Sequence, residues 1–187
     1  MGRVSKAQAE ENRRRVVETA SRLFREQGTH ISVADLMKAA GLTHGGFYKQ
    51  FASKEALVDE ATTYAFAELT RRHEAGLERH AGQPDAARRA FIEAYLSVGH
   101  RDNAADGCPV AGLAADIARG TEEREARRVY TEGVREFADW LTSDDREDGL
   151  ARLSTLIGAL VLSRATRDSP LSEEILTAAR EALTAAD

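Results

Sequence analysis

The chain has 187 residues, 42% of them hydrophobic and 30% charged, with a net charge of −5, which is typical of a soluble globular protein with a core. No apolar run approaches the roughly 18 residues needed to span a bilayer, and the polar residues 1–15 argue against a signal peptide. The single cysteine, Cys108, excludes an internal disulfide, so we expect a cytoplasmic location.

Helix-forming Ala, Leu, Glu and Arg are abundant and Pro is scarce, so the composition predicts an all-α chain. In the first half, apolar residues from Val16 to Phe24 recur on one helix face, and Gly28 is a suitable stop. Ser32 and Ser53 are suitable N-caps for a short helix and a long one. The helices predicted in this half span about residues 7–27, 33–40, 43–50 and 53–80.

Three prolines divide the second half of the chain. Pro84 and Pro109 suit the first position of a helix, whereas Pro170 separates two helices. The stretch 100–107 is polar and is predicted to be a loop. The helices predicted in this half span about residues 84–96, 109–120, 122–141, 149–164 and 172–184, which gives about nine helices in all.

The two short helices, joined by a turn at Gly41, follow the plan of a helix-turn-helix. Leu36, Phe47 and Phe51 are expected to lock the pair onto the first helix. A generic pair of packed helices is the alternative interpretation of the same pattern. The residues expected to face outward are Thr43, His44, Gly45, Tyr48 and Lys49.

The charge of the chain is divided unevenly between its two parts. Residues 1–54 contain 10 Lys and Arg against 5 Asp and Glu, a net charge of +5. Residues 55–187 contain the remaining 16 basic and 26 acidic side chains, a net charge of −10. A basic end on an acidic body indicates contact with nucleic acid at that end, although solvated helix surfaces explain the same charges.

The segment from residue 20 to residue 57 resembles, along its whole length, the DNA-binding domain of the TetR family of transcriptional regulators. The match needs no insertion or deletion, although two adjacent glycines in the recognition helix depart from the family pattern. The residues that carry the resemblance are Leu23-Phe24, Gly28, Val33–Leu36, Ala40–Thr43, Gly46–Tyr48 and Phe51–Leu57.

The resemblance implies a three-helix DNA-binding domain over residues 1–54 and a helical ligand-binding and dimerisation domain over residues 55–187. It implies a dimeric regulator, by family default a repressor that a small-molecule effector releases from a palindromic operator. A small helical enzyme and an architectural DNA-binding protein without a ligand are the alternatives. No nucleophile and base are found in a catalytic pattern, so no enzyme activity and no cofactor are expected.

The family's DNA contacts carry over by position. Tyr48 and Lys54 resemble its phosphate anchors, a hydroxyl donor and a point charge. The full set of implied DNA-binding residues is Ser32, Val33, Thr43, His44, Gly45, Tyr48, Lys49, Ser53 and Lys54. Further basic candidates for contacts with flanking backbone are Arg3, Lys6, Arg13 and Arg14.

The same resemblance implies an effector pocket among the middle helices and a homodimer through the last two helices, at about residues 149–164 and 172–184. Leu160 is expected to lie in that interface. Plain core packing is the alternative for each pocket candidate. These candidates are Tyr64, Phe91, Tyr95, Cys108, Leu113, Tyr130, Phe137 and Trp140.

Cys108 precedes Pro109 and is therefore expected at a helix N-cap, where the positive end of the helix lowers a thiol pKa. A regulator that senses electrophiles or oxidants through Cys108 is the alternative function, and an inert buried thiol is the competing interpretation. His73 and His80, seven residues apart, are too distant to share one metal ion, so no metal site is assigned.

Overall fold

The computed structural model describes residues 6–120, 124–142 and 146–185. All regular structure in these residues is helical, which confirms the all-α prediction. None of these helices combines the length and the hydrophobicity that a transmembrane span requires. In chain order the helices are α1 (Lys6–Gln27), α2 (Val33–Ala39), the 3₁₀-helix η1 (His44–Lys49), α3 (Lys54–Arg79), α4 (Pro84–Tyr95), α5 (Val98–Asp102), α6 (Pro109–Arg119), α7 (Glu125–Leu141), α8 (Arg146–Ala165) and α9 (Leu171–Thr184).

The short helix α5 corrects the predicted loop over residues 100–107 at its first three residues, whereas residues 103–107 lie outside any helix, as predicted. The hydroxyl of Ser97 accepts a hydrogen bond from the backbone N–H of His100, 3.2 Å away, and so caps the helix. At the other end, the Arg164 guanidinium donates to the carbonyls of Arg101 and His100, at 3.0 and 3.2 Å. These bonds satisfy backbone groups that a five-residue helix leaves unpaired, so a distant arginine stabilises α5.

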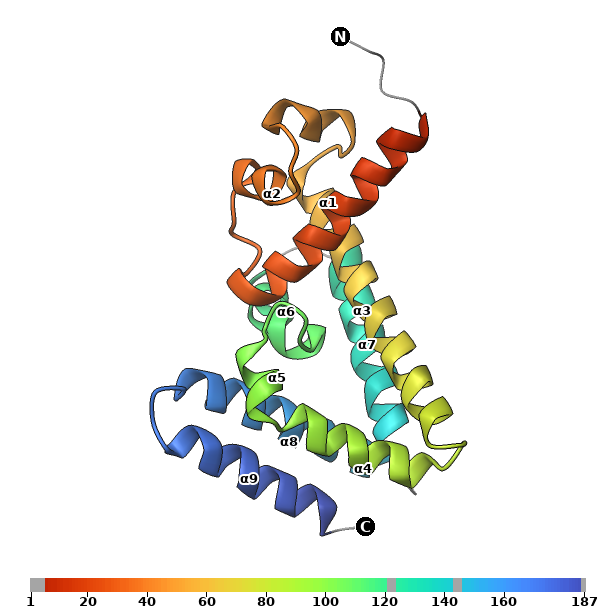
Figure 1. Ribbon diagram of the computed structural model, residues 1–187, viewed down its shortest axis with the longest axis vertical. Helices are drawn as coiled ribbons and strands as arrows, with labels where there is room; N and C mark the ends of the chain where they lie inside the picture. The colour runs from red at the N-terminus through yellow and green to blue at the C-terminus, as the bar shows by residue number, and fades with distance from the viewer. Residues whose placement is uncertain (1–5, 121–123, 143–145, 186–187) are drawn as a thin grey trace.

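The helices α1, α2 and η1 and the first two turns of α3 form a compact end of the molecule, here called the head (Figure 1). Val16, Ala20 and Phe24 form the buried face of α1, which packs against α2 and α3. Leu57 and Ala61 on α3 belong to the same core. The apolar spacing along α1 thus gives the packed face that the sequence predicts.

The remaining helices form the body, in which α4, α8 and α9 lie at the opposite end of the molecule from η1 and α6 adjoins α1 (Figure 1). The helix α3 connects the two parts, because Phe66 at its middle and Leu69 beyond it belong to the body core. Leu160 on α8 is fully buried within this core. The expectation that Leu160 lies in a dimer interface is therefore wrong, because its side chain packs inside its own chain.

Several large apolar side chains of the last two helices remain exposed. Val161 and Leu162 on α8 are 45% and 57% exposed, and Leu171 at the start of α9 is 47% exposed. A Cβ atom added to Gly158, on the same helix, would meet no other atom within 4 Å. The outer face of α8 is therefore apolar and open to close approach by another helix.

Candidate functional site

The first short helix of the head begins with a side-chain cap. The Ser32 hydroxyl accepts a hydrogen bond of 3.1 Å from the backbone N–H of Asp35 and donates one of 2.6 Å to its carboxylate. Val33 opens α2 and is half-buried against the head core. Ser32 is exposed, so this helix start faces solvent, while Leu36 and Met37 anchor the helix inside.

The turn after α2 depends on Gly41. Its φ is +69°, in the left-handed region that favours glycine, and its N–H donates to the carbonyl of Lys38 at 3.0 Å. The chain then enters η1, whose fully buried Phe47 lies with its ring centroid 5.4 Å from that of Phe51. These contacts hold η1 at a fixed angle on the head.

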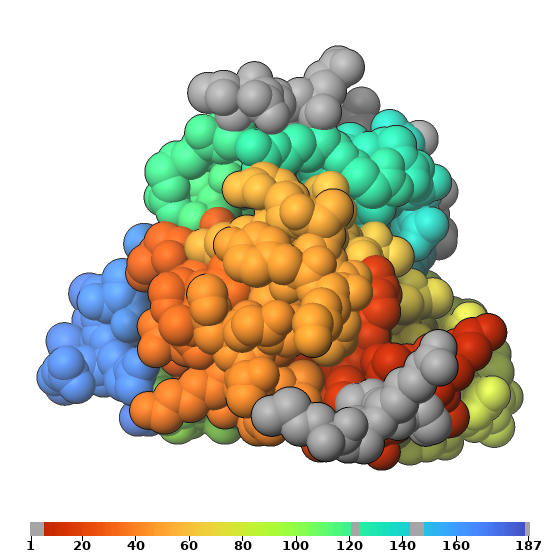
Figure 2. Space-filling model, turned by 90° about the horizontal axis from the view of Figure 1, so that it is seen from above, coloured from red at the N-terminus to blue at the C-terminus, as the bar shows by residue number. Residues whose placement is uncertain are grey.

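The outer side of η1 is a solvent-facing polar surface. Tyr48 is 66% exposed, and its ring meets that of His44 edge-on at 6.3 Å. Thr43, Gly45 and Lys49 are also exposed. Figure 2 looks onto this end of the molecule, where the orange segment containing α2 and η1 occupies the centre of the face. The structure thus brings these five predicted DNA-binding residues onto one exposed surface, here called the head surface.

The segment is a 3₁₀-helix, whereas the sequence predicts an ordinary short helix there. Gly45 and Gly46 account for the difference, because glycine lowers the propensity for a regular α-helix. A Cβ atom at Gly45 would meet nothing within 4 Å, so the backbone is open to solvent there.

The start of α3 adjoins the head surface. The Ser53 hydroxyl accepts a hydrogen bond of 3.1 Å from the backbone N–H of Ala56, so it serves as the helix cap. Lys54 is the first residue of the helix and is half-buried. The positive end of the helix dipole and the basic residue Lys54 are therefore at the same end of α3, an arrangement that favours an anion.

The basic residues of α1 are mostly engaged within the chain. Arg13 donates two hydrogen bonds of 2.5 and 2.6 Å to Glu60, and its guanidinium lies 4.8 Å from the Phe51 ring centroid. Arg14 binds Glu11, and Lys6 lies 3.9 Å from Glu10. Arg3 falls outside the described residues. The guanidinium of Arg13 thus stabilises the junction of α1 and α3 within the chain.

The body contains a cavity of about 280 Å³ between the second half of α3, α4 and the ends of α5, α6 and α7. Three alanines on one face of α4, at positions 87, 90 and 94, leave the space. Of the eight predicted ligand-binding residues, four line this cavity: Phe91, Tyr95, Cys108 and Trp140.

The other four predicted ligand-binding residues lie elsewhere. Phe137 is buried behind the cavity wall, in ring contact with Phe91 and Trp140. Tyr64 and Leu113 pack against the head core, because their faces of α3 and α6 are turned toward α1. The Tyr130 hydroxyl donates to the carbonyl of Val110 at 2.8 Å, which ties α7 to α6.

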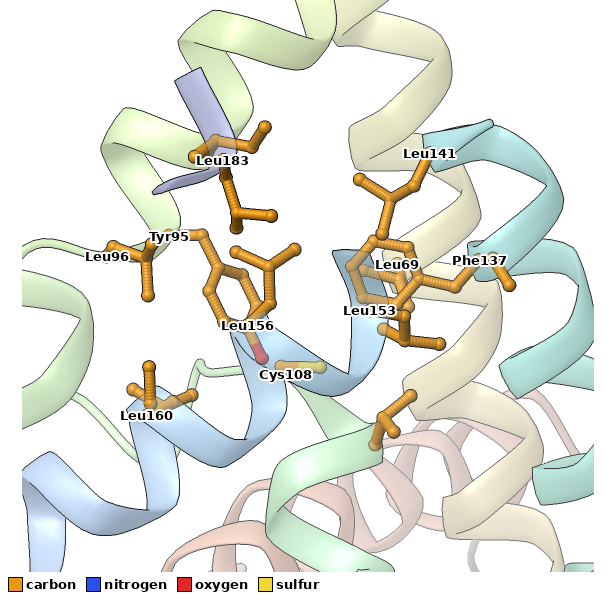
Figure 3. Close-up of a cluster of buried hydrophobic side chains, with 14 of the residues drawn as sticks. Leu69, Tyr95, Leu96, Cys108, Phe137, Leu141, Leu153, Leu156, Leu160 and Leu183 are labelled. Carbon is orange, nitrogen blue, oxygen red and sulfur yellow. The ribbon is translucent and has the colours of Figure 1, made fainter. Parts of the chain in front are cut away.

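Cys108 is the N-cap of α6, as predicted, but it is only 3% exposed. Burial raises the pKa of its thiol above the usual value, which agrees with the interpretation as a buried thiol and not with a pKa lowered by the helix end. Tyr95 points its hydroxyl toward the Cys108 sulfur (Figure 3). That hydroxyl is buried and has no hydrogen-bond partner among the described residues.

Two arginines at the cavity were not anticipated from the sequence. Arg72 and Arg79 line it from α3, together with Leu69, Gly76 and His80. These positions are spaced so that they lie on one face of a helix, and that periodicity is the feature of the sequence that indicates a shared surface.

A buried arginine joins the head to the loop that precedes α6. The Arg25 guanidinium, on α1, donates to the carbonyl of Gly107 at 3.0 Å and to Glu68 on α3 at 3.1 Å. The backbone N–H of Thr29 donates to the carboxylate of Asp116, on α6, at 2.7 Å. The loop before α6 is therefore bonded to α1, and α6 itself is bonded to the residues that follow α1.

Comparison with known sequences identifies the head. Residues 16–61 match the family described as bacterial regulatory proteins, tetR family. The HTH-type transcriptional regulator AcrR of Shigella flexneri is 39% identical over 61 residues. That match covers 32% of this chain and 28% of the relative, so it spans less than a third of either protein.

Comparison with solved structures extends the likeness to the whole fold. The reduced form of NemR from E. coli superposes with a TM-score of 0.77 at 20% identity, covering 92% of this chain and 95% of that one. A TetR transcriptional regulator from Legionella pneumophila gives 0.74 at 17% identity and covers 100% and 99%. One from Chloroflexus aurantiacus gives 0.72 at 23%, covering 95% and 94%. At these identities the likeness shows a shared fold.

Proposed function

We propose that this chain, which is a TetR-family transcriptional regulator, acts as a dimeric repressor that a small-molecule effector releases from a palindromic operator. The observation that carries the proposal is the head surface, where five polar or small residues face solvent over a rigid aromatic core. A packed head with such a surface fits the major groove in the way a recognition helix does.

The proposed DNA contacts divide by chemistry. His44 and Lys49 offer donors to base edges, and Gly45 lets the backbone approach the duplex. Tyr48 and Lys54 bind phosphates on either side, with the start of α3 adding its dipole. Phosphate contacts fix the position of the head, and base contacts select the sequence.

The proposed dimer forms through the outer face of α8 and through α9. Leu150, Val161, Leu162 and Leu171 are exposed large apolar side chains there, and Gly158 permits close helix approach. A two-fold dimer brings two heads to one side of the assembly, which requires an operator with two symmetric half-sites. We take residues 1–54 as the DNA-binding domain and residues 55–187 as the domain for dimerisation and effector binding.

The proposed coupling runs from the cavity through α6 to α1. Cys108 lines the cavity, and Gly107 beside it accepts the hydrogen bond of Arg25. A Cβ atom on Gly112 would lie 3.0 Å from the Arg25 Cα atom, so α6 and α1 are in tight backbone contact. A ligand that shifts the start of α6 changes the angle of the head. The DNA is released because the ligand binds more tightly to the state whose heads do not fit the operator than to the state that binds DNA.

The test is selection of bound duplexes from a random library with the full-length chain. The proposal predicts a palindromic consensus with half-sites about one helical turn apart, or somewhat more. A consensus without symmetry would contradict dimeric recognition, and the absence of any consensus would contradict sequence-specific binding.

A regulator that senses oxidants or electrophiles through Cys108 is a second candidate. It is favoured by the structural similarity to NemR, whose structure is that of a reduced form. The burial of the sulfur and its raised pKa oppose rapid reaction.

A further inference from the structure

The charges around the cavity differ in sign from the net charge of residues 55–187. Residues 55–187 carry a net charge of −10, as 16 basic and 26 acidic side chains. The charged side chains that line the cavity are nevertheless those of Arg72 and Arg79, and no carboxylate of a described residue lines it. A basic cavity in an acidic domain indicates an anionic ligand, because the site attracts negative charge locally.

The two arginines are available to a ligand. Both are exposed, and neither forms an ion pair with a carboxylate in the part of the chain that the structure describes. Arg72 donates to the backbone carbonyl of Asp106 at 2.6 Å, while the Asp106 carboxylate is paired with Arg22. Guanidinium groups bind carboxylates with two parallel hydrogen bonds, so a carboxylate fits this edge of the cavity.

The inner wall of the cavity is aromatic. The ring centroids of Phe91 and Trp140 are 4.9 Å apart at 71°, and those of Phe91 and Tyr95 are 5.5 Å apart. The alanine face of α4 leaves a volume of about 280 Å³ beside these rings, near the lower end of small-molecule sites. Such walls favour a planar ring, which packs edge-on or offset against them.

Tyr95 contributes its ring to the cavity wall, while its hydroxyl is buried and points toward the Cys108 sulfur (Figure 3). The cavity thus offers arginines at its exposed edge and aromatic rings along its wall.

From these contacts we propose that the cavity binds a small aromatic carboxylate, with its ring among Phe91, Tyr95 and Trp140 and its carboxylate at Arg72 and Arg79. This inference rests on the proposed function in that the same cavity is the effector site. It adds the chemical class of the effector, a single-ring organic anion.

The test uses three probes of one shape, namely benzoate, benzamide and benzylamine. Trp140 is the only tryptophan of the chain and lines the cavity, so its fluorescence reports binding directly. We expect benzoate to bind about tenfold or more tightly than neutral benzamide, and benzylamine to bind least, because charge-assisted hydrogen bonds exceed neutral ones.

Variants locate the charge that gives this preference. Arg79→Met is expected to remove most of the advantage of benzoate over benzamide, and Arg79→Lys to retain part of it. Arg89→Met, an exposed position of α4 outside the cavity, removes the same charge and is expected to leave the advantage unchanged.

Each outcome separates this inference from the proposed function. Equal binding of benzoate and benzamide, no binding of any probe, or an anion preference that Arg79→Met leaves intact would overturn the ligand class, whatever the DNA selection shows. Benzoate binding that leaves operator affinity unchanged would support the ligand class while contradicting effector release. Failure of the ligand-free protein to select a DNA sequence would contradict the proposed function alone.

Discussion

The guanidinium of Arg25, on α1, and the carboxylate of Glu68, on α3, form an ion pair of 3.1 Å in which the arginine side chain is 1% exposed. The same guanidinium donates to the carbonyls of Ser21 and Gly107, both at 3.0 Å. One buried cation therefore joins α1, α3 and the loop before α6, the three segments that meet between the head and the body.

Glu68→Gln is expected to lower the free energy of unfolding by about 1–2 kcal/mol, because it leaves the buried Arg25 charge without its counter-ion. The Glu68 carboxylate is partly exposed, and Arg25 keeps its hydrogen bonds to two backbone carbonyls, so the loss of stability is smaller than for a fully buried ion pair. Urea unfolding measures this loss. Glu74→Gln, an exposed carboxylate of the same helix, is the matched control. Equal stability of both variants would show that the pair contributes little.

His73 is expected to make the protein less stable in acid. It is 7% exposed, its ring is stacked on Trp140 at 4.2 Å, and its Nε2 atom has no partner among the described residues. Burial lowers the pKa of His73 from 6.5 to about 4. Between these values the unfolded chain binds a proton that the folded chain excludes, so stability falls as the pH falls from about 6.5 toward about 4.

The size of this effect is about 2 kcal/mol between pH 7 and about pH 5. His73→Phe keeps an aromatic ring against Trp140 and is expected to remove that part of the acid sensitivity. Burial also lowers the pKa of His100, so a smaller sensitivity remains in the variant. Urea unfolding at the two pH values measures both chains, and an identical loss in each would exclude His73 as the cause.

Cys108 is expected to react slowly with iodoacetamide at neutral pH. Its sulfur is buried, and burial raises the pKa of the thiol, so little thiolate is present or accessible. Labelling of the native protein, compared with the protein in urea, measures the protection by mass spectrometry. Rapid native labelling that also reduces DNA binding, with Cys108→Ser resistant to that loss, would favour the thiol-sensing function instead.

Leu162→Glu is expected to convert the proposed dimer to monomers, because it places a charge in the apolar face of α8 without disturbing the core. Light scattering after size-exclusion chromatography measures the mass. Ala67→Glu, on the exposed face of α3, is the control and is expected to remain dimeric. A dimer in both variants would place the interface elsewhere.

The head was predictable because its signals are local. The left-handed turn at Gly41, the cap at Ser32 and the apolar spacing that buries Phe47 all lie within a few residues of the structure that they determine. The helix α5 was missed because much of its support comes from Arg164, which is distant in the sequence.

The cavity was predictable only in part, since its walls come from five helices. The sequence indicates apolar faces but not which face meets which neighbour. Leu113 was assigned to the pocket although its side of α6 packs on the head, and Arg72 and Arg79, which line the cavity, were not among the predicted pocket residues. Tertiary packing decides such assignments.

The central claim is that the head surface reads a DNA sequence. Its most direct test is the ratio of affinities for the selected duplex and a scrambled one, measured by fluorescence anisotropy for the wild type, His44→Ala and Lys54→Ala. His44→Ala is expected to lower the ratio by about fivefold or more, since a base contact is worth about 1–3 kcal/mol. Lys54→Ala is expected to weaken both complexes equally and to flatten the salt dependence by about one unit per protomer. An unchanged ratio in His44→Ala, or equal wild-type affinity for both duplexes, would contradict the claim.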